Sequence, residues 1–125
     1  MTDEPAFSAA DLRQFTGSEQ FFRHGLSRKH IYTEGVHYLA RRAGCYWLLD
    51  KIALHSTPAI DAEDFQVWTL TLKPDRTAVI VTEDGNGTVL KTEDITWTDF
   101  PLPEISLWAE RNERGGFTIM LPSER

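Results

Sequence analysis

The residues with the clearest capacity for chemistry are one cysteine and four histidines, because a thiol beside an imidazole can form a nucleophile–base pair. Cys45 is the only cysteine in the 125-residue sequence, and its candidate partners are His24, His30, His37 and His55. On one continuous helix, His37 would lie about 80° around the axis from Cys45, at about 100° per residue. The two side chains would therefore not share a face closely. We interpret Cys45 as a small buried hydrophobic residue.

The sequence also lacks the usual signatures of metal, cofactor and phosphate sites. It contains no Cys-x-x-Cys, His-x-x-x-His or Gly-x-Ser-x-Gly motif, the spacings typical of zinc sites and serine nucleophiles. Gly85 and Gly87 resemble part of a phosphate loop, but the residues after them favour a strand instead of the required helix. We expect no metal, no cofactor and no catalytic residues, so an enzyme is the less favoured class.

The charge of the chain restricts its partners. The 13 basic and 19 acidic residues give a formal net charge of −6 at pH 7, which opposes non-specific binding to phosphate backbones. The main basic concentration consists of Arg28, Lys29, Arg41 and Arg42. We interpret it as a solvated surface, and nucleic-acid binding is the disfavoured alternative. The acidity either serves solubility or presents an acidic face to a basic partner.

The sequence shows neither a membrane segment nor an export signal. It has no uninterrupted apolar run of the roughly 20 residues that a membrane-spanning helix needs, and no charged-then-apolar leader at its start. A single cysteine excludes an intramolecular disulfide, which favours a reducing compartment. We therefore expect a soluble, cytoplasmic protein.

One long stretch with helical periodicity dominates the first half of the chain. Its apolar stripe consists of Val36, Leu39, Ala40, Ala43, Tyr46 and Trp47. This spacing predicts a helix over 33–54, capped by Thr33. Gly44 either allows close packing or divides two shorter helices; we favour one helix, bent or closely packed at Gly44. Two short helices are predicted before it, over 8–15 and 16–25, after a loose tail at 1–7.

After Pro58 the apolar period falls to about 2 residues, which predicts strands. The expected strands cover 65–72, 78–82, 89–97, 105–110 and 117–121. The sequence Asp-Gly-Asn-Gly at 84–87 predicts a tight hairpin turn. Pro101 and Pro103 predict a stiff connection before the fourth strand.

These elements predict an α+β fold in which the N-terminal helices pack on one face of a roughly five-stranded antiparallel meander sheet. A meander is expected because short connections make consecutive strands antiparallel neighbours. The length favours a single domain over 1–125. The last strand would be an edge without Lys or Pro, through which a homo-oligomer could form.

Trp108 is the main candidate for contact with a partner protein. It alternates with Leu107 on the fourth predicted strand, so the two side chains point to opposite faces of the sheet. Trp108 is then either exposed or covered by the N-terminal segment. Trp97 is expected to join the same partner-binding surface.

A pocket between the long helix and the sheet is the second candidate site. We expect Tyr32, Tyr46, Trp47 and Asp50 to line it. Asp50 lies among apolar residues of the helix, and it would require a partner such as Arg or Tyr if it is buried. Such a partner would give Asp50 a structural role.

Several segments, in order along most of the chain, resemble a family of small bacterial and phage proteins catalogued as a domain of unknown function, DUF6876. They are FTGSEQF (15–21), YTEGV (32–36), YWLLD (46–50), EDGNG (83–87), TDFPLP (98–103) and LPS (121–123). The resemblance implies a bacterial or mobile-element origin and a compact single domain. It brings no established activity and no catalytic residues. The loop at 114–116 departs from the family's pattern by being longer.

The favoured function is a small non-enzymatic protein-binding module, such as an accessory or inhibitor protein of a phage or mobile element. Small size, acidity and the lack of a catalytic motif support it. The alternative is a small-ligand-binding protein or enzyme that uses the pocket between the long helix and the sheet.

Overall fold

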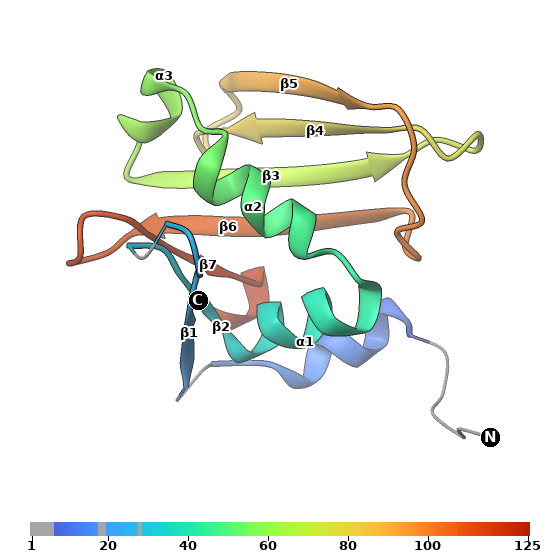
Figure 1. Cartoon of the computed structure of the whole chain (residues 1–125), viewed down its shortest axis with the longest axis horizontal. Coiled ribbons are helices and arrows are strands. Elements are labelled where there is room, and N and C mark those ends of the chain that lie inside the picture. Colours follow the sequence, from blue (N-terminus) through green and yellow to red (C-terminus); the bar gives the residue numbers. More distant parts are fainter. Residues whose placement is uncertain (1–6, 18–19, 28) are drawn as a thin grey trace.

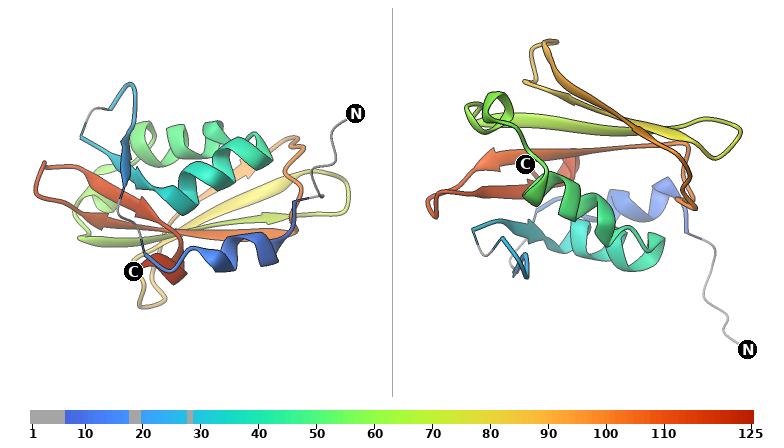
Figure 2. Two further views of the ribbon diagram at one scale, coloured as in Figure 1. Left: turned by 90° about the horizontal axis from the view of Figure 1, so that it is seen from below. Right: turned by 45° about the horizontal axis from the view of Figure 1, so that its top comes forward.

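The computed structural model of the chain describes residues 7–17, 20–27 and 29–125. Within them the protein has a mixed α+β fold, in which two α-helices cover one face of a sheet (Figure 1, Figure 2). The predicted fold class is confirmed at this level. The predicted tail at 1–7 lies almost entirely outside the described residues. No helix in the described part is long and apolar enough to cross a membrane.

The strands are β1 (Phe21–Arg23), β2 (Ile31–Thr33), β3 (Phe65–Leu72), β4 (Ala78–Glu83), β5 (Val89–Ile95), β6 (Glu104–Arg111) and β7 (Phe117–Met120). The helices are α1 (Glu34–Ala43), α2 (Tyr46–Leu54) and α3 (Pro58–Asp61), with 3-10 helices η1 (Ala9–Gln14) and η2 (Pro122–Glu124). Among the described residues, the seven strands form one sheet in the order β1-β2-β7-β6-β3-β4-β5.

The centre of the sheet follows the sequence pattern closely. β3 and β4 alternate buried and partly exposed side chains and pair antiparallel, and β5 pairs antiparallel with β4. Trp68, Leu70 and Ile80 are buried in the core, whose apolar burial is the main stabilising term. The predicted strand 65–72 and the turn at 84–87 are confirmed.

β6 does not lie beside β5, so the five-stranded meander is wrong. After β5 the chain returns to pair β6 antiparallel with the free edge of β3, and β7 follows beside β6. Arg76 fixes the returning segment by donating hydrogen bonds to the carbonyl oxygens of Thr98 (2.9 Å) and Phe100 (2.7 Å). These partners lie 22 and 24 residues away in sequence, beyond the reach of a local pattern.

Two further strands extend the sheet beyond β7. β2 pairs parallel with β7, and β1 pairs antiparallel with β2. The predicted short helix over 16–25 is therefore wrong, and the last strand is not an edge. Phe22 of β1 stacks on His37 and Tyr32, with ring centroids 4.0 Å and 5.7 Å away, and these tertiary contacts outweigh local preference. Residues 18 and 19, which belong to this predicted helix, lie outside the described residues.

The long stretch 33–54 forms two helices, so the prediction of one helix is wrong. Gly44 is the C-cap of α1. It adopts the left-handed conformation (φ 65°), and its N–H donates a hydrogen bond to the Ala40 carbonyl. A Cβ at Gly44 would meet no described atom within 4 Å. Gly44 is therefore needed for the left-handed turn that ends the helix, and not for close packing. The predicted cap is confirmed: Thr33 Oγ1 accepts from the Val36 N–H at 3.3 Å.

A buried carboxylate joins the end of the chain to the start of α1. Glu124 is 9 % exposed, and its carboxylate accepts hydrogen bonds from Thr33 Oγ1 (2.5 Å), the Gly35 N–H (3.1 Å) and the Leu121 N–H (3.0 Å). A Cβ at Gly35 would come within 2.6 Å of Leu121 and 2.7 Å of Glu124. The close approach predicted at Gly44 is thus found at Gly35, where η2 meets α1.

We expect Glu124→Gln to lower the free energy of unfolding by about 2 kcal/mol, because an amide NH2 would replace an acceptor oxygen that faces N–H and O–H donors. Urea denaturation measures this change. The matched control is Glu113→Gln, which removes an exposed carboxylate and should leave stability almost unchanged. Equal stability of the two variants would contradict the role given to Glu124.

Candidate functional site

Trp108 lies on the face of the sheet that points away from α1 and α2. Its neighbour Leu107 is fully buried on the helix side, and side chains alternate along a strand. The Trp108 ring packs edge-on against Phe65, with centroids 5.3 Å apart. The Arg125 guanidinium lies 4.7 Å from the Phe65 ring centroid and 5.8 Å from that of Trp108. Trp108 is therefore half-buried, and its ring packs against Phe65 and Arg125.

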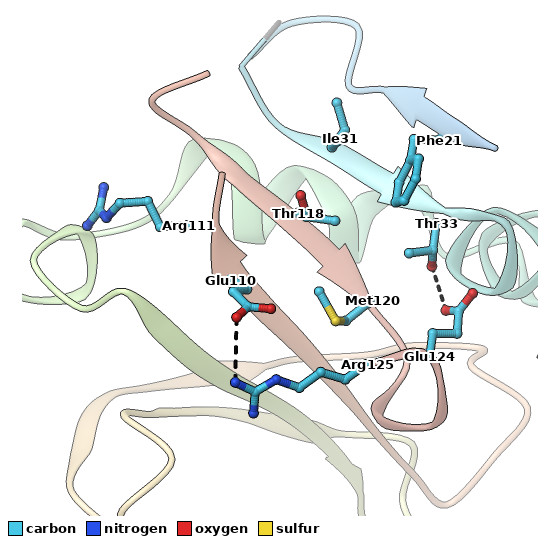
Figure 3. Close-up of a pocket in the computed structure, with 9 residues that line it drawn as sticks. All are labelled: Phe21, Ile31, Thr33, Glu110, Arg111, Thr118, Met120, Glu124 and Arg125. Carbon is cyan, nitrogen blue, oxygen red and sulfur yellow. Dashed lines mark hydrogen bonds and ion pairs between the residues drawn. The ribbon is translucent and has the colours of Figure 1, made fainter. Parts of the chain in front are cut away.

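A hollow of about 340 Å³ opens beside Trp108 on the same face (Figure 3). We call it the outer-face pocket. Its lining residues come from β1, β2, β6, β7 and the C-terminal turn, and they are Phe21, Ile31, Thr33, Glu110, Arg111, Thr118, Met120, Glu124 and Arg125. Met120 is the cross-strand partner of Trp108, so the pocket continues the Trp108 surface.

Few charged groups at the outer-face pocket remain open to a ligand. Arg111 pairs with Asp64 (Nε to Oδ1, 2.6 Å) and donates to the Asp61 carbonyl, and it points away from the hollow in Figure 3. The Arg125 guanidinium reaches Glu110 at 3.5 Å, a loose and exposed pair. The pocket thus combines an apolar floor with a polar rim and brings together no catalytic set.

Trp97 does not belong to the Trp108 surface. It is 64 % exposed and lines a groove of about 430 Å³ with Trp47 and Lys51 of α2 and the rest of the segment 93–99. We call this the Trp groove. Among the described residues, none lines both this groove and the outer-face pocket.

Some charged residues that line the Trp groove form ion pairs and others do not. Glu93 binds Lys51 and lies 3.5 Å from Lys91. Burial acts to raise the pKa of Glu93, but hydrogen bonds and positive charge from these two lysines outweigh it and lower that pKa. Asp94 and Asp99 have no ion-pair or hydrogen-bond partner for their side chains within the described part of the chain.

The structure brings together three of the four residues predicted to form a pocket between helix and sheet. Tyr32, Tyr46 and Asp50 line a hollow of about 160 Å³, whereas Trp47 does not. The Asp50 side chain is 51 % exposed, and its partner is His24, with Nε2 and Oδ1 2.8 Å apart. Asp50 is therefore not buried, and its partner is a histidine rather than the Arg or Tyr expected for a buried Asp50. Sequence reasoning missed His24 because 26 residues separate the pair.

His24 is unsuited to act as a base. Its Nδ1 accepts hydrogen bonds from the backbone N–H groups of Leu26 (3.2 Å) and Ser27 (3.0 Å). Because backbone N–H groups only donate, the proton of a neutral ring lies on Nε2 and is donated to Asp50. Burial, with a smaller effect from Tyr46, raises the pKa of Tyr32. The hollow therefore offers polar contacts from Tyr32, Tyr46 and Asp50.

One residue of the basic concentration, Arg42, is engaged with aromatic side chains of the protein itself. Arg42 donates to the Tyr38 hydroxyl at 3.0 Å and lies over the Phe7 and Tyr38 rings. Arg41 and Lys29 are exposed, and Arg28 lies outside the described residues. In the described part of the chain, no three His, Cys, Asp or Glu side chains cluster so as to bind a metal ion.

Cys45 is buried in the core, as the sequence predicts. It is 1 % exposed, and its thiol lies 3.8 Å from the Leu39 carbonyl oxygen. Burial raises the pKa of the thiol to about 12. Because the thiolate is the nucleophile, a raised pKa suppresses reactivity at neutral pH.

We expect native Cys45 to resist alkylation by iodoacetamide at pH 8. With a pKa near 12, the thiolate fraction is on the order of 10⁻⁴, and burial restricts access further. Mass spectrometry should show slow modification of the native protein and fast modification of the same chain in urea. Comparable rates in both conditions would mean that Cys45 is accessible and its pKa unperturbed.

The model of a family of unknown function, DUF6876, matches residues 6–125 of the chain. Searches of curated proteins and of solved structures found no match.

Proposed function

The chain belongs to the DUF6876 family, whose function is unknown, and we propose that it is a small protein-binding module that contacts its partner through the outer face of the sheet. The observation that carries this proposal is the outer-face pocket beside Trp108. Phe21, at its border, is 52 % exposed. An exposed phenylalanine next to a hollow gains stability when a partner covers it.

The residue types at this surface support a protein partner. Phe21 and Met120 line the outer-face pocket from two strands, and Trp108 lies opposite Met120 on a third, with the Arg125 guanidinium 5.8 Å from the Trp108 ring centroid. Aromatic residues, Met and Arg are enriched at protein interfaces, where a few of them supply most of the binding energy. Glu110 and Arg125 would form the polar rim.

The proposed occupant is an apolar side chain of a partner protein, inserted over Met120. The pocket's apolar floor lies between the exposed Phe21 and the loose Arg125–Glu110 pair. This pair can separate at low cost because exposed ion pairs contribute little to stability. An accessory or inhibitor role in a phage or mobile element follows as part of the proposal, from small size, acidity and the family resemblance.

Site-specific photo-cross-linking in the native host tests this surface. A benzophenone amino acid at Phe21 should give one discrete adduct with another protein. The matched control is the same residue at Val89, which is 56 % exposed on β5 and lines none of the described hollows. The same adducts from both positions, or an adduct of two copies of this chain, would contradict the proposal.

With the cross-linked partner purified, we expect Trp108→Ala to weaken binding about tenfold or more, the usual effect of losing an interfacial tryptophan. Titration calorimetry measures the change. Val89→Ala, which removes an exposed apolar side chain outside both candidate surfaces, should leave the affinity unchanged. If Trp108→Ala keeps its unfolding midpoint and its affinity, the surface assignment is wrong.

A second candidate function is small-ligand binding in the hollow beside Asp50. The convergence of Tyr32, Tyr46 and Asp50 on one hollow favours it. Native mass spectrometry of protein purified from its host should then show a bound small molecule that is lost in Asp50→Ala. A wild-type spectrum without added mass would remove this candidate.

A further inference from the structure

The Trp groove is a second binding surface, separate from the one used in the proposed function. It lies between α2 and the segment 93–99, whereas the outer-face pocket lies over β1, β2, β7 and β6. Its two aromatic residues differ in exposure, since Trp47 is half-buried against the core and Trp97 is 64 % exposed. The groove therefore has one fixed aromatic wall and one open one.

Trp97 is exposed although its backbone is firmly fixed. The next residue, Thr98, donates its N–H to the Arg76 carbonyl at 2.9 Å and accepts from Arg76 Nε at 2.9 Å. Thr98 and Phe100 are both buried. An exposed indole on a fixed backbone offers a large contact area at low entropic cost. No described side chain stacks on the Trp97 ring.

The charge of the groove favours a cation. Its lining residues include three acidic ones, Glu93, Asp94 and Asp99, and one basic one, Lys51, which gives a local formal charge of +1 − 3, or −2. Lys51 is already bound to Glu93, and the Asp94 carboxylate lies on the opposite face of β5 from Glu93, because side chains alternate along a strand. The Asp99 carboxylate is therefore the groove's acidic group without a partner among the described residues, and an anionic ligand would meet it at a cost.

We propose that the Trp groove binds an arginine side chain presented by a basic segment of a protein. A guanidinium is planar, stacks on aromatic faces and donates two parallel hydrogen bonds to a carboxylate. The groove supplies both complements: the exposed indole of Trp97 and, two positions further along the same segment, the unpaired carboxylate of Asp99. The net charge of −6 would add long-range attraction for such a segment.

NMR of the four tryptophan indole N–H signals tests the site directly. The probe is the capped peptide Gly-Arg-Arg-Gly, and the matched control is the same peptide with citrulline, the neutral isostere of arginine. We expect the arginine peptide to shift the signals of Trp97 and Trp47 in a saturable way, and to leave those of Trp68 and Trp108 in place. The citrulline peptide should shift none of them.

Two double variants separate the groove from general acidity. Asp94→Asn with Asp99→Asn should weaken binding of the arginine peptide about fivefold, the effect of losing the Asp99 contact together with the nearby negative charge of Asp94. Glu83→Gln with Glu113→Gln makes the same change in net charge outside the groove and should leave the affinity within about twofold. Trp97→Ala should abolish the shift of the Trp47 signal.

Three results would overturn the proposal: no saturable shift with the arginine peptide, equal shifts with the citrulline peptide, or equal weakening in both double variants. None of these results bears on the outer-face pocket, because Trp108 and Phe21 line a different surface. Failure of one site is thus distinguishable from failure of the other.

Discussion

The Glu124 carboxylate is the contact on which the arrangement of this fold most depends. It accepts hydrogen bonds from Thr33 and Gly35, 91 and 89 residues earlier in the chain, at the point where β2 becomes α1. This joint fixes β2 against β7 in the parallel pair that local sequence does not encode. Without β2 in that position, β1 would have no strand to pair with, and the outer-face pocket would lose Phe21 and Ile31. A buried charge with this many donors is stabilising, whereas the same charge without them would be costly.

The elements that follow local rules could be predicted from sequence. Strand β3, the turn at 84–87 and the Thr33 cap each depend on residues a few positions apart. The alternation of apolar residues was sufficient to predict the strand. The strand order could not be predicted, because Arg76 fixes the return to β6 through carbonyl groups over 20 residues away. Gly44 shows a different limit of prediction. Glycine is suited both to close packing and to a left-handed helix cap, so the sequence alone does not tell which of the two roles Gly44 has.

The candidate sites were only partly predictable for the same reason. Alternation with Leu107 places Trp108 on the outer face, but nothing local indicates that Arg125 and Phe65 cover its ring. Three of the predicted pocket residues do converge, yet His24, which completes the hollow, pairs with Asp50 only through tertiary structure. The outer-face pocket was missed because two of its strands, β1 and β2, are three residues long, too short to produce a periodic pattern.

The salt bridge between α2 and β5 also affects how the folded chain behaves at high concentration. β5 is the longer of the two edge strands, and an unpaired edge can add a strand from another molecule. Its Glu93 turns inward to bind Lys51 of α2, and its Lys91 lies 3.5 Å from Glu93 and donates to the His55 carbonyl. A strand from a second molecule that paired there would meet charged side chains that are already paired within this molecule. Inward-pointing charge is a known defence against edge-to-edge aggregation. The salt bridge between Lys51 of α2 and Glu93 of β5 thereby also opposes growth of the sheet into fibrils.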